Sequence, residues 1–259
     1  MDDKFLKVAK EAALEAGKII QKYSSNFGQK NIKNNDSSDF ATEADIESEK
    51  IIVEIIRENF PDHNIIAEEG TSIQKDSDYK WAVDPLDGTI SYAAGVPSYT
   101  VSIGLLFKGE PIVGVIYHIA DNNLYFAQKG KGAYLNGKKI TVNSRNDFNN
   151  AVVSFDTGHK NQRKEKFDDY ISSLMFKVGY IYNLGSGALA LAYTSCGIFD
   201  AHVQTGSVWD HLAGAVIIRE AGGKVTDFEG KEPDWSKDRL SIVASNGLIH
   251  DQILEALKH

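Results

Sequence analysis

The sequence predicts a mixed α/β fold in which two N-terminal helices cover a largely antiparallel sheet and an α/β half follows. The first sixty residues show helical periodicity, and residues 64–135 show short apolar runs separated by turn signals. The remainder alternates between strand and helix patterns, which is typical of an α/β layer. With 259 residues, the chain is long enough for one large domain or two closely packed halves.

Two amphipathic helices are predicted in the first sixty residues. Apolar residues recur at helical spacing over residues 3–23, and a second helix covers residues 42–60, where Pro61 ends it. Thr42 followed by Asp45 resembles a capping box with a shorter acid. We expect the polar residues 24–39, rich in Asn and Ser, to form a mobile loop.

Short strands follow the second helix. Asn136-Gly137 is a strong hairpin signal, and residues 108–111 connect two apolar runs as another hairpin. Pro85 lacks an N–H group, so the strand that begins at Trp81 is expected to stop at Asp84. The predicted strands are 64–67, 81–83, 99–107, 112–119, 124–127 and 132–135.

The second half alternates between predicted strands and predicted helices. Residues 143–150 are rich in Asn and poor in apolar side chains, so we expect the halves to be 1–145 and 146–259. The layers would be helix, sheet, helix, sheet, helix. The predicted strands are 151–154, 180–182, 198–203, 224–226 and 241–244, and the predicted helices are 165–176, 185–194, 209–221 and 249–257.

Composition excludes several classes of function. The formal charge is −8 and no run of Lys and Arg exceeds two residues, which argues against a nucleic-acid partner. The single cysteine, Cys196, allows no intrachain disulfide and suits a reducing cytoplasm. The acidic N-terminus is unlike a signal peptide, and the longest apolar runs, such as 101–107, are too short to span a bilayer. We therefore expect a cytoplasmic protein without a membrane segment.

Residues 81–89 are the most informative segment. An apolar strand leads into Asp84, a forced turn, Asp87, Gly88 and Thr89. Two hard carboxylates beside a backbone that an anion can approach suit Mg²⁺ and a phosphate group. An ordinary turn with Pro at its second position and Gly at its end is the alternative. Haloacid-dehalogenase-type phosphatases place their two acids two residues apart, whereas the three-residue spacing here favours metal ligands.

Further acids lie at predicted element ends. Glu68 and Glu69 follow a strand, while Asp210 and Asp45 lie in the first turns of helices. Each alone fits a solvated turn or an acid favoured by the helix dipole. Active sites form at such ends, so we expect Glu68 and Asp210 to join Asp84 and Asp87 in one site.

Two motifs together resemble the inositol monophosphatase family of Mg²⁺-dependent, lithium-sensitive phosphatases. They are Asp84-Pro85-Leu86-Asp87-Gly88-Thr89 and Trp209-Asp210-His211-Leu212-Ala213-Gly214, and the segments 39–45, 67–69 and 220–227 fall at the family's intervals. The resemblance covers essentially the whole chain. It implies a five-layer αβαβα sandwich, a homodimer, and two Mg²⁺ ions, or three if a weaker ion binds at Glu68 through waters.

The resemblance also implies a role for each residue. Glu68, Asp84 and the Leu86 carbonyl would hold one Mg²⁺, and Asp84, Asp87 and Asp210 the other. Glu68, Thr89 and Asp45 would act in catalysis, the last two by orienting the nucleophilic water. The substrate would contact Asp87, Gly88, Thr89, Gln204 and Asp210. His211 and Cys196 need no catalytic role, and we interpret His211 as a packing residue.

The chain departs from the family pattern at two places. Asn34 stands where the family has a lysine, so either the adjacent Lys33 substitutes for it or this cation is absent. Residues 201–208 lack the acid that binds sugar hydroxyls in inositol-specific members, although Gln204 can still bond a hydroxyl less strongly. The metal chemistry is shared across the family, whereas the leaving-group pocket is not.

The predicted function is that of a Mg²⁺-dependent phosphomonoesterase for a small polyol or sugar phosphate. Inositol 1-phosphate is the first candidate substrate. Fructose 1,6-bisphosphate, histidinol phosphate, adenosine 3′,5′-bisphosphate and NADP are alternative substrates. A catalytically silent phosphometabolite-binding protein would have lost a ligand, and all four carboxylates are present.

Overall fold

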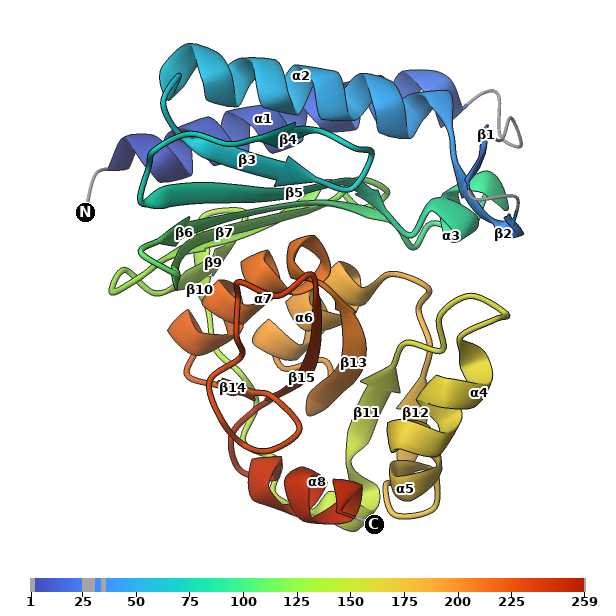
Figure 1. Cartoon of the computed structure of the whole chain (residues 1–259). Coiled ribbons are helices and arrows are strands. Elements are labelled where there is room, and N and C mark those ends of the chain that lie inside the picture. The colour runs from blue at the N-terminus through green and yellow to red at the C-terminus, as the bar shows by residue number, and fades with distance from the viewer. Residues whose placement is uncertain (1–2, 25–30, 34–35, 259) are drawn as a thin grey trace.

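Five layers of secondary structure are stacked in the computed structural model (Figure 1). It describes residues 3–24, 31–33 and 36–258, with backbone only for residues 31–33 and 36–40. Helices α1 (Asp3–Tyr23) and α2 (Glu43–Asn59) form the first layer and cover an eight-stranded sheet. Helices α6 (Gly187–Ser195) and α7 (Val208–Glu220) separate this sheet from a five-stranded one. The predicted αβαβα sandwich is thus confirmed.

The eight-stranded sheet has the spatial order β10-β9-β8-β7-β6-β5-β3-β4. Only β3 and β5 pair in parallel, and the other neighbours are antiparallel. Its strands are β3 (Asn64–Ala67), β4 (Ser72–Ile73), β5 (Tyr79–Asp87), β6 (Thr100–Phe107), β7 (Glu110–His118), β8 (Asn123–Gln128), β9 (Ala133–Leu135) and β10 (Lys138–Ile140). Both predicted hairpins are confirmed, and Asn136 and Gly137 have the positive φ angles, 49° and 81°, of a two-residue turn.

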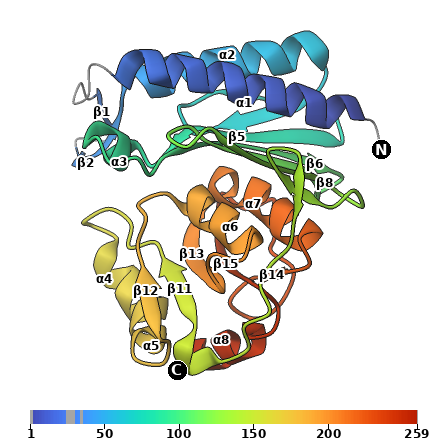
Figure 2. The same ribbon diagram turned by 180° about the vertical axis from the view of Figure 1, so that it is seen from behind.

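The five-stranded sheet is mixed, with the order β12-β11-β13-β15-β14. Strand β11 pairs in parallel with β12 and β13, whereas β15 is antiparallel to β13 and β14. The strands are β11 (Val152–Phe155), β12 (Tyr180–Tyr182), β13 (Ala201–Ser207), β14 (Lys224–Thr226) and β15 (Arg239–Ser245). A continuous helical segment, formed by α4 (Arg163–Lys166), a π-helical turn (Phe167–Ile171) and α5 (Ser172–Met175), makes the outer layer with α8 (His250–Leu257) (Figure 2).

Part of the predicted loop 24–39 is a strand pair, so that prediction was wrong for these residues. Strands β1 (Asn31–Lys33) and β2 (Asp36–Ala41) pair antiparallel. Their sequences are mostly polar and lack the apolar alternation that reveals a half-buried strand. Residues 25–30 and Asn34, where the family lysine is missing, lie outside the described residues, as does the Lys33 side chain.

Strand β5 continues past Asp84, which corrects the predicted end of that strand. Its pairing with β6 is interrupted between Asp84, opposite Ser102, and Asp87, opposite Thr100. Two residues, Pro85 and Leu86, therefore face one residue of β6, as in a β-bulge. The bulge accommodates the missing N–H of Pro85 and redirects the chain into the short helix α3 (Thr89–Ala93).

Strand β13 also differs from its prediction. It begins at Ala201 rather than at residue 198, and it ends at Ser207, directly before α7. Its polar final residues carry no strand pattern but pair with β15 throughout. No helix in the described part of the chain is both long and apolar enough to cross a membrane.

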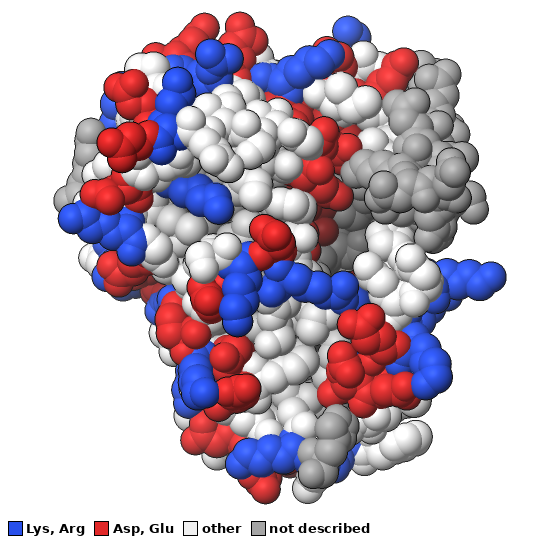
Figure 3. Space-filling model, viewed as in Figure 1, with Lys and Arg blue, Asp and Glu red and all other residues white. Residues whose placement is uncertain are grey.

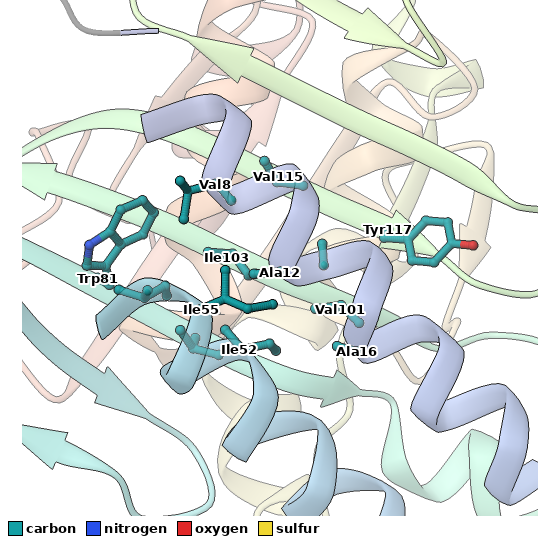
Figure 4. Close-up of a cluster of buried hydrophobic side chains, with 14 of the residues drawn as sticks. Val8, Ala12, Ala16, Ile52, Ile55, Trp81, Val101, Ile103, Val115 and Tyr117 are labelled. Carbon is teal, nitrogen blue, oxygen red and sulfur yellow. The ribbon is translucent and has the colours of Figure 1, made fainter. Parts of the chain in front are cut away.

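The first apolar core lies between the two N-terminal helices and the eight-stranded sheet (Figure 4). Val8, Ala12 and Ala16 of α1 face the strands, and α2 adds Ile52 and Ile55. The predicted apolar stripes of these helices are therefore the buried faces.

Helix α7 lies directly on the other face of this sheet. Gly104 of β6 and Gly114 of β7 are paired across the strands. A Cβ atom at Gly114 would lie 2.2 Å from the Ala213 carbonyl oxygen, and one at Gly104 would lie 2.6 Å from Cγ of Leu212. Side chains at these positions would push the helix away, so the glycine pair sets its distance from the sheet.

Gly114→Ala should therefore destabilise the protein. Overpacking of this kind costs about 1–3 kcal/mol, because the obstacle is helix backbone that cannot rotate away. Thermal unfolding measures the loss. Gly17→Ala is the comparison variant, because its Cβ would meet the buried ring of Tyr117 rather than helix backbone. An unfolding temperature for Gly114→Ala equal to that of the unchanged chain would contradict the proposed close contact.

Candidate active site

A cavity of about 470 Å³ lies between the two halves of the molecule. In the space-filling view, a column of acidic side chains runs down the upper half to the boundary between the halves, where basic side chains cross the face (Figure 3). The polar residues lining the cavity include Glu68, Asp84, Asp87 and Thr89 from the first half and Asp156, Lys166, Gln204, Asp210 and Arg239 from the second.

Glu68 and Asp84 lie together because β3 and β5 are parallel neighbours. Ala67 is paired with Val83, and the Glu68 N–H donates to the Val83 carbonyl at 3.1 Å. Both strands therefore end at one edge, as the sequence predicts. Asp84 is only 2% exposed, and its Oδ1 accepts a hydrogen bond from the Leu86 N–H at 3.0 Å.

Three acids hold the starts of three helices. Asp45 Oδ2 accepts from the Thr42 N–H at 2.7 Å in the predicted capping box of α2. Asp210 Oδ2 accepts from the Ser207 N–H at 2.6 Å in an equivalent box of α7. Asp87 Oδ2 accepts from the Ala188 N–H at 2.7 Å in the first turn of α6. Each contact fixes the direction of a carboxylate that belongs to the candidate site.

Thr89 connects Asp45 to the turn that follows β5. Its Oγ1 lies 3.0 Å from Asp45 Oδ1 and 3.1 Å from the Leu86 carbonyl oxygen, so both acceptors are within reach of its single hydroxyl proton. Gly88 precedes it with φ of 92°, and a Cβ there would lie 2.6 Å from the Ser98 carbonyl oxygen. Only glycine fits this position, because neighbouring backbone takes the space that a Cβ would need, and Gly88 itself lines the cavity.

The carboxyl groups disfavour one another's charge. Burial raises the pKa of Asp84 well above its usual range, and the neighbouring Glu68, Asp87 and Asp210 carboxylates raise it further. Burial raises the pKa of Asp87 to about 6 against the opposing hydrogen bonds from Ser186 and Ala188. Burial and then the Asp87 charge raise the pKa of Asp210 to about 7. The site therefore favours bound protons or a cation.

Hard oxygen donors of this kind fit Mg²⁺. Among the described residues, however, no three acidic, histidine or cysteine side chains converge as the ligands of one ion do. Shared coordination by the acids at this edge would therefore need small side-chain rotations.

Asp156 and Lys166 are among the cavity residues that were not predicted from the sequence. Asp156 follows the end of β11 and forms an ion pair with Lys166 of α4. Lys166 is the one lysine or arginine that is buried among the described side chains. Asp156 shares the strand-end position that identified Asp84, whereas Lys166 stands in a charged segment that resembles an exposed helix surface.

His211 lies next to Asp210 but remains in the protein interior. It is fully buried, and burial lowers its pKa to about 3, so that the ring is neutral. This agrees with a packing role.

The whole chain, residues 1–259, matches the model of the inositol monophosphatase family. It is 37% identical to a protein of Aquifex aeolicus named fructose-1,6-bisphosphatase/inositol-1-monophosphatase, over 98% of this chain and 96% of that protein. It is also 39% identical to the Nus factor SuhB of Vibrio cholerae, over 87% of this chain and 85% of that protein.

Solved structures agree with these matches. The inositol monophosphatase from Anabaena has a TM-score of 0.86 and 36% identity, over 98% of this chain and 95% of that one. SuhB from Bartonella henselae has a TM-score of 0.88 and 31% identity, over 97% of each chain. The layered fold, the two motifs at its central cavity and these full-length matches lead to one conclusion: the chain belongs to the inositol monophosphatase family.

Proposed function

We propose that this chain is a Mg²⁺-dependent phosphomonoesterase for a small polyol or sugar phosphate, with inositol 1-phosphate as the leading substrate. The observation that carries the proposal is the set of four acids from three chain segments, Glu68, Asp84, Asp87 and Asp210, beside the turn at Gly88. The relatives have different names, fructose-1,6-bisphosphatase/inositol-1-monophosphatase and Nus factor SuhB, so family membership does not select the substrate.

The metal ligands are assigned as the family resemblance implies. Glu68, Asp84 and the Leu86 carbonyl would hold one Mg²⁺, and Asp84, Asp87 and Asp210 would hold a second. Bound Mg²⁺ lowers the pKa of a coordinated water and neutralises charge that develops on the phosphoryl and leaving-group oxygens. The mutual repulsion of these acids supports the assignment, because a divalent cation removes its cause.

The residues around the acids orient the reactants. Thr89 donates its hydroxyl proton to Asp45 Oδ1 and uses an oxygen lone pair to accept a hydrogen bond from the attacking water. The backbone N–H groups of Gly88 and Thr89, which line the cavity at the start of α3, bind phosphate oxygens. Neither step requires a covalent intermediate on the protein.

Fructose 1,6-bisphosphate is the second candidate substrate. Arg163 and Arg239 line the same cavity, and two guanidinium groups suit a second phosphate group.

A homodimer is also proposed, on the family resemblance and on an exposed apolar surface. Phe176, Tyr180, Tyr182 and Ile198 are 87%, 64%, 43% and 50% exposed, and two of them lie on the edge strand β12. The ring of Tyr182 stacks on that of Phe199 at 5.3 Å. An apolar surface on an edge strand is typical of an interface between proteins.

Mg²⁺ should raise the unfolding temperature of metal-free protein by about 5–10 °C at a hundredfold excess over its Kd. The ion binds the folded chain and offsets the repulsion among the acids. Differential scanning fluorimetry with and without EDTA measures the shift. Asp168→Asn, which changes an exposed acid on the outer layer, should keep the shift, and its absence in the unchanged chain would contradict the metal assignment.

Asp84→Asn should lower kcat for inositol 1-phosphate by about 10²–10³-fold and leave the fold intact. The amide oxygen still accepts from the Leu86 N–H, while the charge that two ions would share is lost. Phosphate release at saturating Mg²⁺ gives the rate, and circular dichroism checks the fold. Normal turnover in this variant would reject the mechanism, and no release by the unchanged chain from any phosphate ester would favour a phosphometabolite-binding protein instead.

Tyr180→Glu should convert the proposed dimer into a monomer, because a charge on the apolar surface must be desolvated on association. Light scattering coupled to size-exclusion chromatography gives the mass. Leu14→Glu, at an exposed apolar residue of α1, is the control. A monomeric unchanged chain at micromolar concentration would refute the dimer.

A further inference from the structure

The buried stripe of α2 is polar at its start and apolar over the rest of the helix. Asp45, Ser48 and Glu49 are 0%, 0% and 5% exposed, and Ile52 and Ile56 continue the stripe at helical spacing. Burying an ionised carboxylate costs free energy unless hydrogen-bond donors surround it. The presence of two acids, one turn apart, on the buried face therefore depends on the donors that they meet.

Glu49 binds the turn that carries Glu68. Its Oε2 accepts from the Glu69 N–H at 2.7 Å. Its Oε1 accepts from the N–H and the hydroxyl group of Thr71, at 3.0 and 2.6 Å. Both oxygens are thus engaged by the chain that directly follows β3. Hydrogen bonds to an ionised group are roughly twice as strong as those between neutral groups, so this carboxylate is a firm anchor for the turn.

The backbone around Glu68 is held from two sides. Every N–H group from residue 67 to residue 71 has an acceptor. The Glu68 N–H donates to the Val83 carbonyl of β5 at 3.1 Å, and two of the other N–H groups are those that Glu49 binds. Strand β5 therefore fixes one side of this turn, and helix α2 fixes the other.

Asp45 makes a similar contact one helical turn earlier. Its Oδ1 lies 3.0 Å from the hydroxyl oxygen of Thr89, in the turn that follows β5. Strands β3 and β5 are parallel neighbours, and the start of α2 lies at the edge where both strands end (Figure 1). Two acids four residues apart on one helix thus hold the turns that follow two adjacent strands. Helix α2 thereby sets the position of one turn relative to the other.

We propose that Glu49 is a positioning residue for the metal site, because it fixes the Glu68 carboxylate relative to Asp84 through the backbone of the Glu68 turn. Glu49 does not line the cavity, and both of its oxygens are engaged, so it acts through the turn and not as a ligand. Mg²⁺ demands a near-ideal arrangement of its ligands, so freedom of this turn should weaken the ion. The inference rests on the proposed Mg²⁺-dependent function.

Glu49→Gln tests the positioning role by Mg²⁺ binding. The introduced NH₂ group is a donor that faces a backbone donor, so one side of the turn is released. The Kd for Mg²⁺, measured by isothermal titration calorimetry on EDTA-treated protein, should rise about tenfold. The Mg²⁺ concentration for half-maximal hydrolysis of inositol 1-phosphate should rise by the same factor, whereas KM for the ester at saturating Mg²⁺ should not change.

Two further variants complete the test. Glu54→Gln makes the same change of charge at an exposed acid of α2 and should bind Mg²⁺ as the unchanged chain does. Thr71→Val removes the hydroxyl donor to Glu49 but keeps the backbone N–H, so the Kd should rise about threefold. Circular dichroism in EDTA checks the fold of each variant. Thr71→Val decides the test if Glu49→Gln does not fold.

The outcomes separate this inference from the proposed function. A lower unfolding temperature in EDTA with an unchanged Kd for Mg²⁺ is the result of a merely structural role, and it would reject the positioning role while the Mg²⁺ site stands. An equal loss of affinity in Glu54→Gln would also reject it, because the effect would then be one of overall charge. No binding of Mg²⁺ by the unchanged chain would overturn both proposals.

Discussion

The close contact between α7 and the eight-stranded sheet is the constraint on which the site depends. The paired glycines, Gly104 and Gly114, let the helix backbone rest on the strands. Ser102, the β6 partner of Asp84, donates its hydroxyl to the Trp209 carbonyl at 3.0 Å. This contact fixes the start of α7, and therefore Asp210, relative to the end of β5. Acids from distant parts of the sequence thus face one cavity because of a packing requirement.

The same acids serve the fold and the candidate site. Asp45, Asp87 and Asp210 each give one oxygen to the first turn of a helix, where the helix dipole partly offsets their charge. The sequence allows Asp45 and Asp210 to be interpreted as acids favoured at the start of a helix or as residues of the site. The two interpretations are compatible, because capping sets the direction of the carboxylate: in Asp45, Oδ2 caps α2 while Oδ1 accepts from Thr89 of the candidate site.

The helices and the acid positions could be predicted because they depend on local patterns. Apolar periodicity identifies α1 and α2, and element ends locate Glu68 and Asp84 before any pairing is known. Strand β2 and the bulge at Pro85 could not be predicted, since backbone pairing rather than apolar alternation forms them. The Asp156–Lys166 pair forms because the outer helical segment packs back against the end of β11. No pattern in the sequence reveals this packing.

The proposed metal ligands and the candidate hydroxyl-binding residue lie on different elements of the fold. This separation explains why family membership does not determine the substrate. Relatives named for fructose 1,6-bisphosphate and inositol phosphate hydrolysis or as a Nus factor match this chain at similar identity, 37% and 39%. The metal-binding acids proposed here lie at the ends of β3 and β5 and the start of α7, whereas Gln204, the candidate hydroxyl-binding residue, lies on β13. A substitution at Gln204 changes the hydrogen bonds that the five-stranded sheet offers to the cavity, without moving β5 or α7. Selectivity can therefore diverge on one sheet while the chemistry stays fixed on the other.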